Sequence, residues 1–221
     1  MSTFHPKPDE RGALVALLAP TPATAPDSWL DPRQLATVIP GGALPAALNG
    51  IAFSPWREAP QDDRGWVAVA GRDAGFDEPP FVPAPGKRVA AGVVILEDDG
   101  RVWVVHPSNG FGGYPATFPK GTLDPGMPLH ATAIREAWEE SGLRVVLGGF
   151  LVDLTRSRSR TRYYLGRRAG GCPSDMGWES QAVSLVPRAL LGAVLVNPND
   201  APLVAMLQAG IGSSAAAGFQ P

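Results

Sequence analysis

Three glutamates within five residues, Glu136, Glu139 and Glu140, are the side chains in this sequence whose types and spacing best suit chemistry. If they lie on a helix, each residue advances by about 100°, and the three carboxylates share an arc of roughly 100°. Like charges at this spacing repel, and Gly142 brings the negative helix end close. Hard oxygen ligands so placed suit Mg²⁺ or Mn²⁺. On these residues alone, a solvated acidic helix face is the simpler interpretation.

A helix over Pro128 to Ser141 is expected to position these glutamates. Proline is tolerated in the first helical turn, and Gly142 is expected to end the helix. Before it, Val89–Glu97 and Arg101–His106 predict two strands joined by a tight Asp-Gly turn. Further strands are expected at Gly149–Leu154, Arg162–Leu165 and Gln181–Val186, and further helices at Pro187–Leu195 and Pro202–Gln208.

The residues around the glutamates resemble the signature of the Nudix hydrolases, which runs Gly, five residues, Glu, seven residues, Arg-Glu, an apolar residue, any residue, Glu-Glu, any residue, Gly and an apolar residue. The eight positions that match, of nine defined, are Gly121, Arg135, Glu136, Ala137, Glu139, Glu140, Gly142 and Leu143. The resemblance covers roughly residues 88–208. It implies an α/β fold, a Nudix-like α/β/α sandwich with a mixed sheet.

The resemblance also implies an activity, the metal-dependent hydrolysis of a pyrophosphate bond in a nucleoside diphosphate linked to another moiety. Dinucleoside polyphosphates, ADP-ribose and similar nucleotides are the substrates it suggests. By analogy with the family, Glu136, Glu139 and Glu140 would bind Mg²⁺ or Mn²⁺, and the backbone carbonyl of Lys120 would complete the metal shell beside Gly121. Such metals neutralise charge and activate water in phosphoryl substitution.

The one mismatch in the signature is Met127, which stands where the family has its first Glu. In the family this Glu braces the loop against the helix arginine, here Arg135, and a thioether cannot do so. Asp124, three positions earlier, is the nearest candidate substitute. We expect weaker metal binding or an altered loop rather than an inactive site. A second departure is Ala116, where many relatives have an aromatic residue whose packing role Tyr114 or Phe111 could take.

The general base is left open by the sequence. Glu139 or Glu140 could deprotonate the attacking water, and the loop residue Glu179 is the competing base, as in some branches of the family. Lys120 is a candidate phosphate contact, with simple exposure nearly as good an interpretation. Trp178 precedes the last expected strand and could stack on a nucleobase, although a packed tryptophan is the more common case.

A second group of candidate substrate contacts is an alternating arginine run. If the chain is extended there, all four guanidinium groups point to one side, because strand side chains alternate. Arginine suits bidentate contacts to phosphate, but a solvated hairpin tip is an equally good interpretation. We favour Arg160 and Arg162, which lie closest to the strand containing Tyr164. The run consists of Arg156, Arg158, Arg160 and Arg162.

The first third of the chain differs from the rest in its proline content. Of 24 prolines in 221 residues, 14 fall in residues 1–85, which excludes long helices there. Short strands are expected at Ile51–Phe53 and Trp66–Val69, separated by a turn-rich loop. We therefore predict a Pro-rich accessory module and connector at 1–86, a Nudix-like hydrolase domain at 87–210 and a flexible C-terminal tail at 211–221. A structural collar is the simpler role for the module.

Composition excludes several classes of protein. The chain has 26 Gly without a period of three, a hydrophobic content of 44% and a net charge of −2, so neither collagen nor wholesale disorder fits. A pI near 5.9 argues against nucleic acid, including triphosphorylated RNA ends. The apolar run Ala13–Ala19 is too short to span a bilayer and poorly flanked for a signal peptide. We expect a cytoplasmic protein with a small nucleotide partner, and the sequence leaves a homodimer open.

A second function is compatible with these residues. Met127 and the Pro-rich module are unusual for a minimal hydrolase. The alternative is therefore a catalytically weakened Nudix-fold module that binds nucleotides or regulates a partner.

Overall fold

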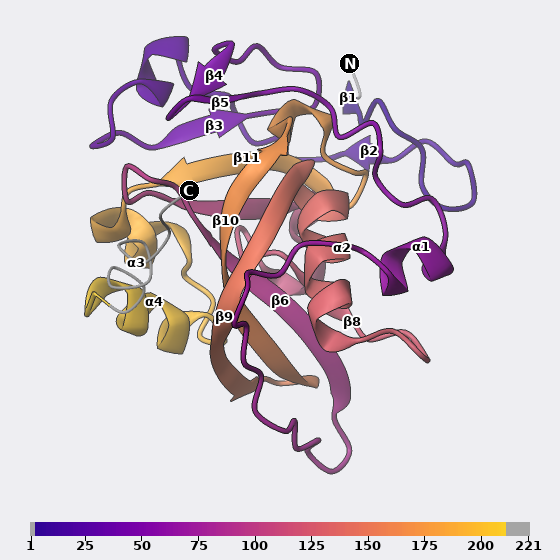
Figure 1. The fold of residues 1–221 in the computed structure, drawn as a ribbon. Coiled ribbons are helices and arrows are strands. Elements are labelled where there is room, and N and C mark those ends of the chain that lie inside the picture. The colour runs from indigo at the N-terminus through magenta and orange to yellow at the C-terminus, as the bar shows by residue number, and fades with distance from the viewer. Residues whose placement is uncertain (1–2, 211–221) are drawn as a thin grey trace.

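A mixed seven-stranded sheet forms the centre of the computed structural model, which describes residues 3–210 (Figure 1). The strand order is β3–β11–β7–β6–β10–β9, and β8 pairs with the first part of β6. Strands β6 and β10 run parallel, whereas the other pairs are antiparallel. The strands span Ala36–Val38 (β3), Arg88–Leu96 (β6), Val102–Pro107 (β7), Lys120–Thr122 (β8), Leu143–Thr155 (β9), Ser159–Gly171 (β10) and Ser180–Val186 (β11).

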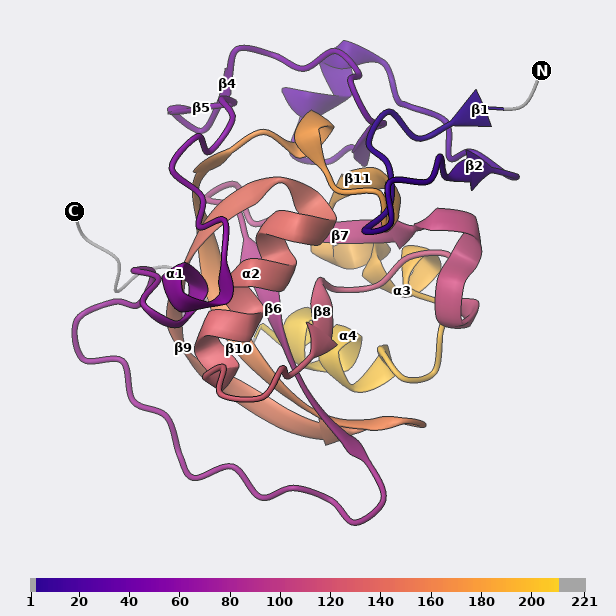
Figure 2. The ribbon, with the colours of Figure 1, turned by 90° about the vertical axis from the view of Figure 1, so that its right-hand side faces the viewer.

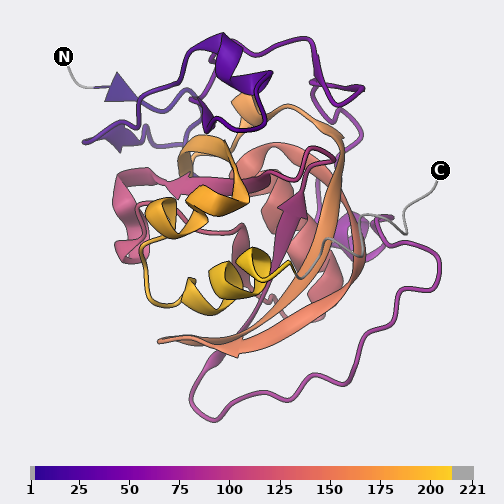
Figure 3. The same ribbon diagram turned by 90° about the vertical axis from the view of Figure 1, so that its left-hand side faces the viewer.

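Helices cover both faces of this sheet. Helix α2 (Leu129–Ser141) packs on one face, and α3 (Leu191–Val194) and α4 (Ala201–Gln208) lie on the other (Figure 3). Alternation along β6 builds two cores, because Val93 faces the α2 side and Val94 faces the α3–α4 side. The expected α/β/α sandwich with a mixed sheet is confirmed.

The elements that position the glutamates agree with the sequence expectations. Helix α2 starts after Pro128 and ends at Gly142, whose φ of 69° is the left-handed conformation that glycine adopts most easily. The hairpin β6–β7 turns at Gly100, whose N–H donates to the Glu97 carbonyl at 2.9 Å. Strands β9 and β10 extend further than the apolar runs predict, because their ends pair with one another and β10 also pairs with β6.

Two expectations about secondary structure were wrong. Trp66–Val69 was expected to form a strand, but helix α1 (Asp63–Val67) occupies this segment. Asp62 caps the helix by accepting a hydrogen bond from the Gly65 N–H, a start signal that the apolar pattern hides. The helix expected over Pro187–Leu195 is divided into the 3-10 turn η4 (Arg188–Leu190) and α3. The expected tail at 211–221 lies outside the described residues.

The Pro-rich region folds as short strands and turns along the edge of the sheet. Its strands are β1 (Thr3–Phe4), β2 (Ala16–Leu17), β3, β4 (Ala47–Leu48) and β5 (Ile51–Ala52), with the 3-10 turn η1 (Pro26–Trp29) between β2 and β3. The sequence did not predict that β3 joins the main sheet beside β11. Trp29, Leu48 and Trp66 belong to the same buried core as α2, so this region is packed into the rest of the protein.

Two buried arginines fasten this region to the sheet. Arg101 donates to the carbonyls of Trp29 at 2.7 Å and Ser28 at 3.1 Å, while also pairing with Asp99. Arg168 pairs with Glu97 and donates to the Leu48 carbonyl at 2.8 Å. Both side chains are at most 1% exposed, so their charges depend on these partners.

Within residues 3–210, none of the helices has both the length and the apolar character needed to cross a membrane.

Candidate active site

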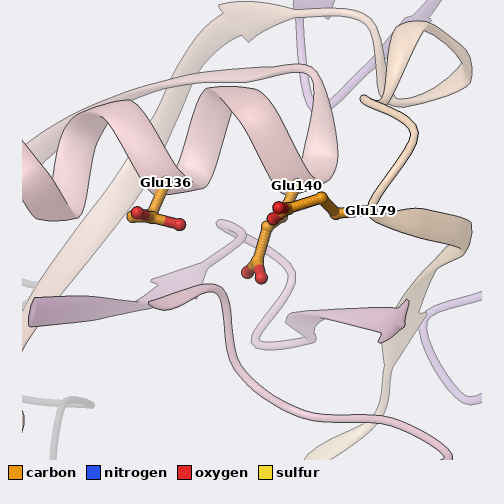
Figure 4. A group of neighbouring side chains, drawn as sticks. All are labelled: Glu136, Glu140 and Glu179. Carbon is orange, nitrogen blue, oxygen red and sulfur yellow. The ribbon is translucent and has the colours of Figure 1, made fainter. Parts of the chain in front are cut away.

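Three carboxylates converge beside the C-terminal half of α2. Glu136 and Glu140 project from one side of the helix, and Glu179 approaches from the loop before β11 (Figure 4). Each offers an oxygen within 4.8 Å of the other two. Glu136 and Glu140 are only 8% and 9% exposed, whereas Glu179 lies at the surface. The spacing on α2 alone could not show that Glu179 completes the group.

Strand β8 packs directly against the acidic face of α2, and this close approach requires a glycine at position 121, the centre of the strand. A Cβ on Gly121 would lie 1.9 Å from Glu136 Oε1, so no larger residue fits without moving that carboxylate. The neighbouring Lys120 N–H donates to Glu140 Oε2 at 2.9 Å. The Lys120–Gly121 backbone therefore lies directly beside both helix carboxylates.

Asp124 takes the partner role expected for it. Its Oδ2 lies 2.6 Å from Arg135 Nη2. Arg135 also lies near Glu136 and Glu139, with N–O distances of 4.0 and 3.8 Å. Met127 itself is buried in the core, so the position that carries a charge in the family contributes packing here. The expected pairing of Asp124 with Arg135 is therefore present.

Glu139 occupies the rim of the site rather than its centre. Its side chain is 42% exposed and its closest cation is Arg135. Its backbone carbonyl accepts a hydrogen bond from the Gly177 N–H at 2.7 Å, which ties the end of α2 to the loop that carries Glu179. Glu139 is therefore adjacent to the three converging carboxylates but is not one of them.

The site resists the accumulation of negative charge. Burial raises the pKa of Glu140 to about 7, although the charge and N–H of Lys120 oppose this shift. Burial also raises the pKa of Glu139 to about 7, and burial followed by the Glu140 charge raises that of Glu136. For Glu179, burial and then the charge of Glu10 raise the pKa. A bound cation would remove this conflict.

The donor set fits a hard divalent cation. Carboxylate oxygens are the ligands that Mg²⁺ and Mn²⁺ prefer, and such ions keep water or phosphate oxygens in their remaining positions. The close approach of Gly121 leaves a backbone segment, rather than a side chain, facing the carboxylates. Among the described residues, this is the one cluster of three or more potential metal-binding side chains.

The alternating arginines do not form a single array. Arg156 lies in the turn between β9 and β10 and bonds Asp200 at 2.8 Å, on the α3–α4 side of the sheet. Arg162 lies on the α2 side, where it pairs with Asp153 and Glu78, both at 2.8 Å. All four would point one way only in an extended chain, and the chain instead reverses direction at residues 156–158, so the run spans a hairpin tip.

The other candidate substrate contacts are distributed around the site and the sheet. Tyr164 is buried and its hydroxyl donates to Glu78 at 2.6 Å, so it shares a partner with Arg162. Arg160 is partly exposed and donates to Thr155 Oγ1 at 3.0 Å. Nearer the glutamates, Lys120 Nζ lies 4.9 Å from the centre of the Tyr114 ring. Tyr114 thus contacts the expected phosphate-binding lysine.

Trp178 lies next to Glu179 and is partly buried. Its carbonyl accepts a hydrogen bond from Ser108 Oγ at 2.7 Å. The loop that contains Ser108, η2 (Ser108–Gly113), therefore supports the segment that carries Glu179. Sequence reasoning missed this support and the proximity of Glu10. The glycine-rich residues 107–115 are typical of a loop, but nothing in the sequence indicates what that loop contacts.

A model of the NUDIX domain matches residues 86–207, slightly more than half of the chain. The chain belongs to the Nudix family. This is a family of pyrophosphohydrolases that typically depend on divalent metals and act on nucleotides.

Solved structures provide further similarities. An ADP-ribose pyrophosphatase from Streptococcus suis is 19% identical, with a TM-score of 0.41 over 46% of this chain and 75% of the other. A C. elegans Ap4A hydrolase is 22% identical, with a TM-score of 0.46 over 59% and 99%. MutT from Aliivibrio salmonicida and Vibrio cholerae is 19% identical, with a TM-score of 0.46 over 55% and 96%. No curated protein sequence matches the chain significantly.

Proposed function

We propose that this chain hydrolyses a pyrophosphate bond in a nucleoside diphosphate linked to another moiety, with Mg²⁺ or Mn²⁺ as cofactor. The observation that carries the proposal is the convergence of Glu136, Glu140 and Glu179 within 4.8 Å. Dinucleoside polyphosphates and ADP-ribose are the substrates to test first, and the solved structures similar to this chain include an Ap4A hydrolase and an ADP-ribose pyrophosphatase.

The residues of the site divide into metal ligands and their support. Glu136 and Glu140 would hold the metal, with Glu139 at the rim and the Lys120 carbonyl beside Gly121 as further ligands. When bound, the metal would neutralise phosphate charge and make water a stronger acid. Arg135, held by Asp124, offsets part of the negative charge of the helix face. Its fixed position keeps the carboxylates oriented toward β8.

Proton removal from the attacking water would fall to Glu139, Glu140 or Glu179. The Glu139 side chain is 42% exposed at the rim of the site, so water can reach its carboxylate. Glu179 approaches from a separate loop, and Glu140 is held by the Lys120 N–H. A glutamine at the base position should lower kcat and leave metal affinity unchanged, whereas one at a ligand position should weaken metal binding.

Substrate contacts would come from residues around the carboxylates. Lys120 carries a positive charge next to the acidic group and would attract phosphate oxygens. Trp178 and Arg160 are candidate contacts for the remainder of the nucleotide. Arg162 and Tyr164 are already bonded to Glu78, so they would hold the segment around Glu78 and Pro79 rather than phosphate.

The alternative of a catalytically weakened nucleotide-binding module rests on Met127 and on the Pro-rich first third. The ion pair between Arg135 and Asp124 supplies the bracing that Met127 cannot, and this favours an active enzyme.

The proposal is tested with a nucleotide panel containing dinucleoside polyphosphates, ADP-ribose and other nucleoside diphosphate derivatives. Reactions with Mg²⁺ or Mn²⁺ in ¹⁸O-labelled water, read by mass spectrometry, identify both the cleaved bond and the phosphorus attacked. We expect two phosphate-containing products, one of them labelled, and no turnover with excess chelator. Ligand binding without hydrolysis across the panel would instead establish the binding module.

A further inference from the structure

The segment that precedes the Nudix match meets the loop that carries Glu179. Strands β1 and β2 form a hairpin, and the chain after β1 runs beside the start of β11, near the end of α2 (Figure 2). Lys7 Nζ donates to the Asp175 carbonyl. The His5 ring is 1% exposed and lies beside the Ser180 backbone. Residues far apart in the sequence therefore pack on both sides of Glu179.

Asn109 connects this hairpin to the catalytic region through both atoms of its side-chain amide. Its Oδ1 accepts from the Leu18 N–H at 2.8 Å, and its Nδ2 donates to the Ala16 carbonyl at 2.8 Å. The amide thus occupies the position of a strand partner at the end of β2. Asn109 has a φ of 56°, a conformation that asparagine tolerates better than most residues.

Gln181 makes a second connection two residues after Glu179. Its Nε2 donates to the Ala19 carbonyl at 3.0 Å and to Thr21 Oγ1 at 2.9 Å. Its Oε1 accepts from the Asn109 N–H at 3.3 Å. Gln181 is 8% exposed, so all three bonds form in a mostly dry environment.

The connections end on the backbone of Glu179 itself. The Ser108 N–H, adjacent to Asn109, donates to the Glu179 carbonyl at 2.7 Å. From the other side, the Gly177 N–H donates to the Glu139 carbonyl at the end of α2. The backbone around Glu179 is therefore fixed between α2 and a loop that the N-terminal segment holds in place.

We propose that residues 3–21 position Glu179, and that Asn109 and Gln181 are the positioning residues. The proposal rests on the proposed function and takes Glu179, one of the three converging carboxylates, as a further ligand of the metal. A carboxylate on a loop needs such support because loops move more than helices, and groups that orient metal ligands affect affinity strongly. The N-terminal segment then supports the active centre through these two residues and is more than a collar.

A matched set of three variants separates positioning from general stability. Asn109→Gly removes the amide and tolerates the same positive φ, and Gln181→Met keeps a similar volume without the hydrogen bonds. The control is Thr37→Val, which removes the 2.6 Å bond between Thr37 Oγ1 and Ser184 Oγ. That bond also joins the N-terminal region to β11, but further along the strand from Glu179.

Three quantities are measured on each full-length protein: the Mn²⁺ dissociation constant without substrate, amide hydrogen exchange over residues 176–181 in chelator, and the melting temperature. Asn109→Gly and Gln181→Met should weaken Mn²⁺ binding roughly ten-fold and accelerate exchange in this loop. Thr37→Val should lower the melting temperature while leaving Mn²⁺ affinity and loop exchange unchanged.

The proposal is overturned if the two variants bind Mn²⁺ and exchange as the unmodified protein does. It is also overturned if Thr37→Val changes both quantities as much as they do, because the effect would then follow stability. If the unmodified protein neither binds Mn²⁺ nor hydrolyses any nucleotide, the proposed function fails, and the role assigned to Asn109 and Gln181 fails with it.

Discussion

At the scale of single residues, the site shows how one charge can be supplied from a different position. The family pattern has Glu where this chain has Met127, and the structure places the compensating carboxylate at Asp124. The ion pair between Asp124 and Arg135 could be predicted, because Asp124 lies in the same short loop before α2 as Met127 and Arg135 needs an anionic partner. Glu179 could be named as a candidate from the sequence, but its position beside Glu136 and Glu140 could not be predicted, because it depends on how the loop before β11 packs against α2.

Exchanging the two positions tests whether the ion pair with Arg135 matters for catalysis. Asp124→Ala should lower kcat/KM by about ten-fold, because one partner of a charged pair that orients the metal site is lost. The double variant Asp124→Ala with Met127→Glu returns the carboxylate to the family position and should recover part of that loss. Steady-state kinetics at saturating Mg²⁺ measure both changes. Unaltered kinetics in Asp124→Ala would show that the pair has no catalytic role.

At the scale of elements, α2 carries a face that is unfavourable in the absence of metal. Its acidic side chains lie near the negative end of the helix, and β8 covers two of them. The limits of α2 could be read from Pro128 and Gly142, whereas α1 was mistaken for a strand. Asp62 caps α1 locally, and Trp66 on this helix packs against Trp138 of α2 with ring centres 5.5 Å apart. The apolar run alone therefore misled the strand prediction, because it shows neither the cap nor the contact with α2.

The acidic face of α2 predicts how stability depends on pH in the metal-free protein. The pKa of Glu140 is raised to about 7 by burial, so the folded chain holds a proton that the unfolded chain has released. The stability that comes from this bound proton is fully present below the ordinary glutamate pKa of about 4.5 and is lost as the pH rises through about 7. Between pH 5 and pH 8, the free energy of unfolding of the chelator-treated unmodified protein should fall by roughly 2 kcal/mol more than that of chelator-treated Glu140→Gln.

Urea denaturation at the two pH values measures this difference. Saturating Mg²⁺ at pH 8 should restore the lost stability in the unmodified protein and act much less on Glu140→Gln, since metal replaces the missing proton. Identical pH dependence in the two proteins would contradict the assignment of a strained, metal-dependent carboxylate at Glu140.

At the scale of the whole molecule, the Pro-rich first third is joined to the Nudix region by a common core. Trp29, Val38 and Leu48 are buried with residues of α2 and β6. The proline content correctly predicted short, irregular elements here. It could not predict that β3 would extend the sheet or that buried Arg101 and Arg168 would bind this region, because those contacts connect residues far apart in the chain.

Deleting residues 1–86 should therefore prevent stable folding. Burial of the N-terminal side chains in the shared core contributes roughly 10 kcal/mol, which is comparable to the total stability of a domain. Circular dichroism and size-exclusion chromatography of the truncated protein should show loss of a cooperative thermal transition or aggregation. A monomer that melts cooperatively and hydrolyses nucleotides at the full rate would show that the region is a dispensable collar.

The central claim, that the carboxylates beside α2 form a metal-dependent hydrolytic site, is tested most directly by comparing the unmodified chain with Glu140→Gln. Both proteins are assayed on the best nucleotide of the panel across a Mg²⁺ titration, after circular dichroism has established that both are folded. We predict that turnover requires Mg²⁺ and falls by at least about a thousand-fold in Glu140→Gln. A folded Glu140→Gln protein with unchanged Mg²⁺-dependent turnover would contradict the account.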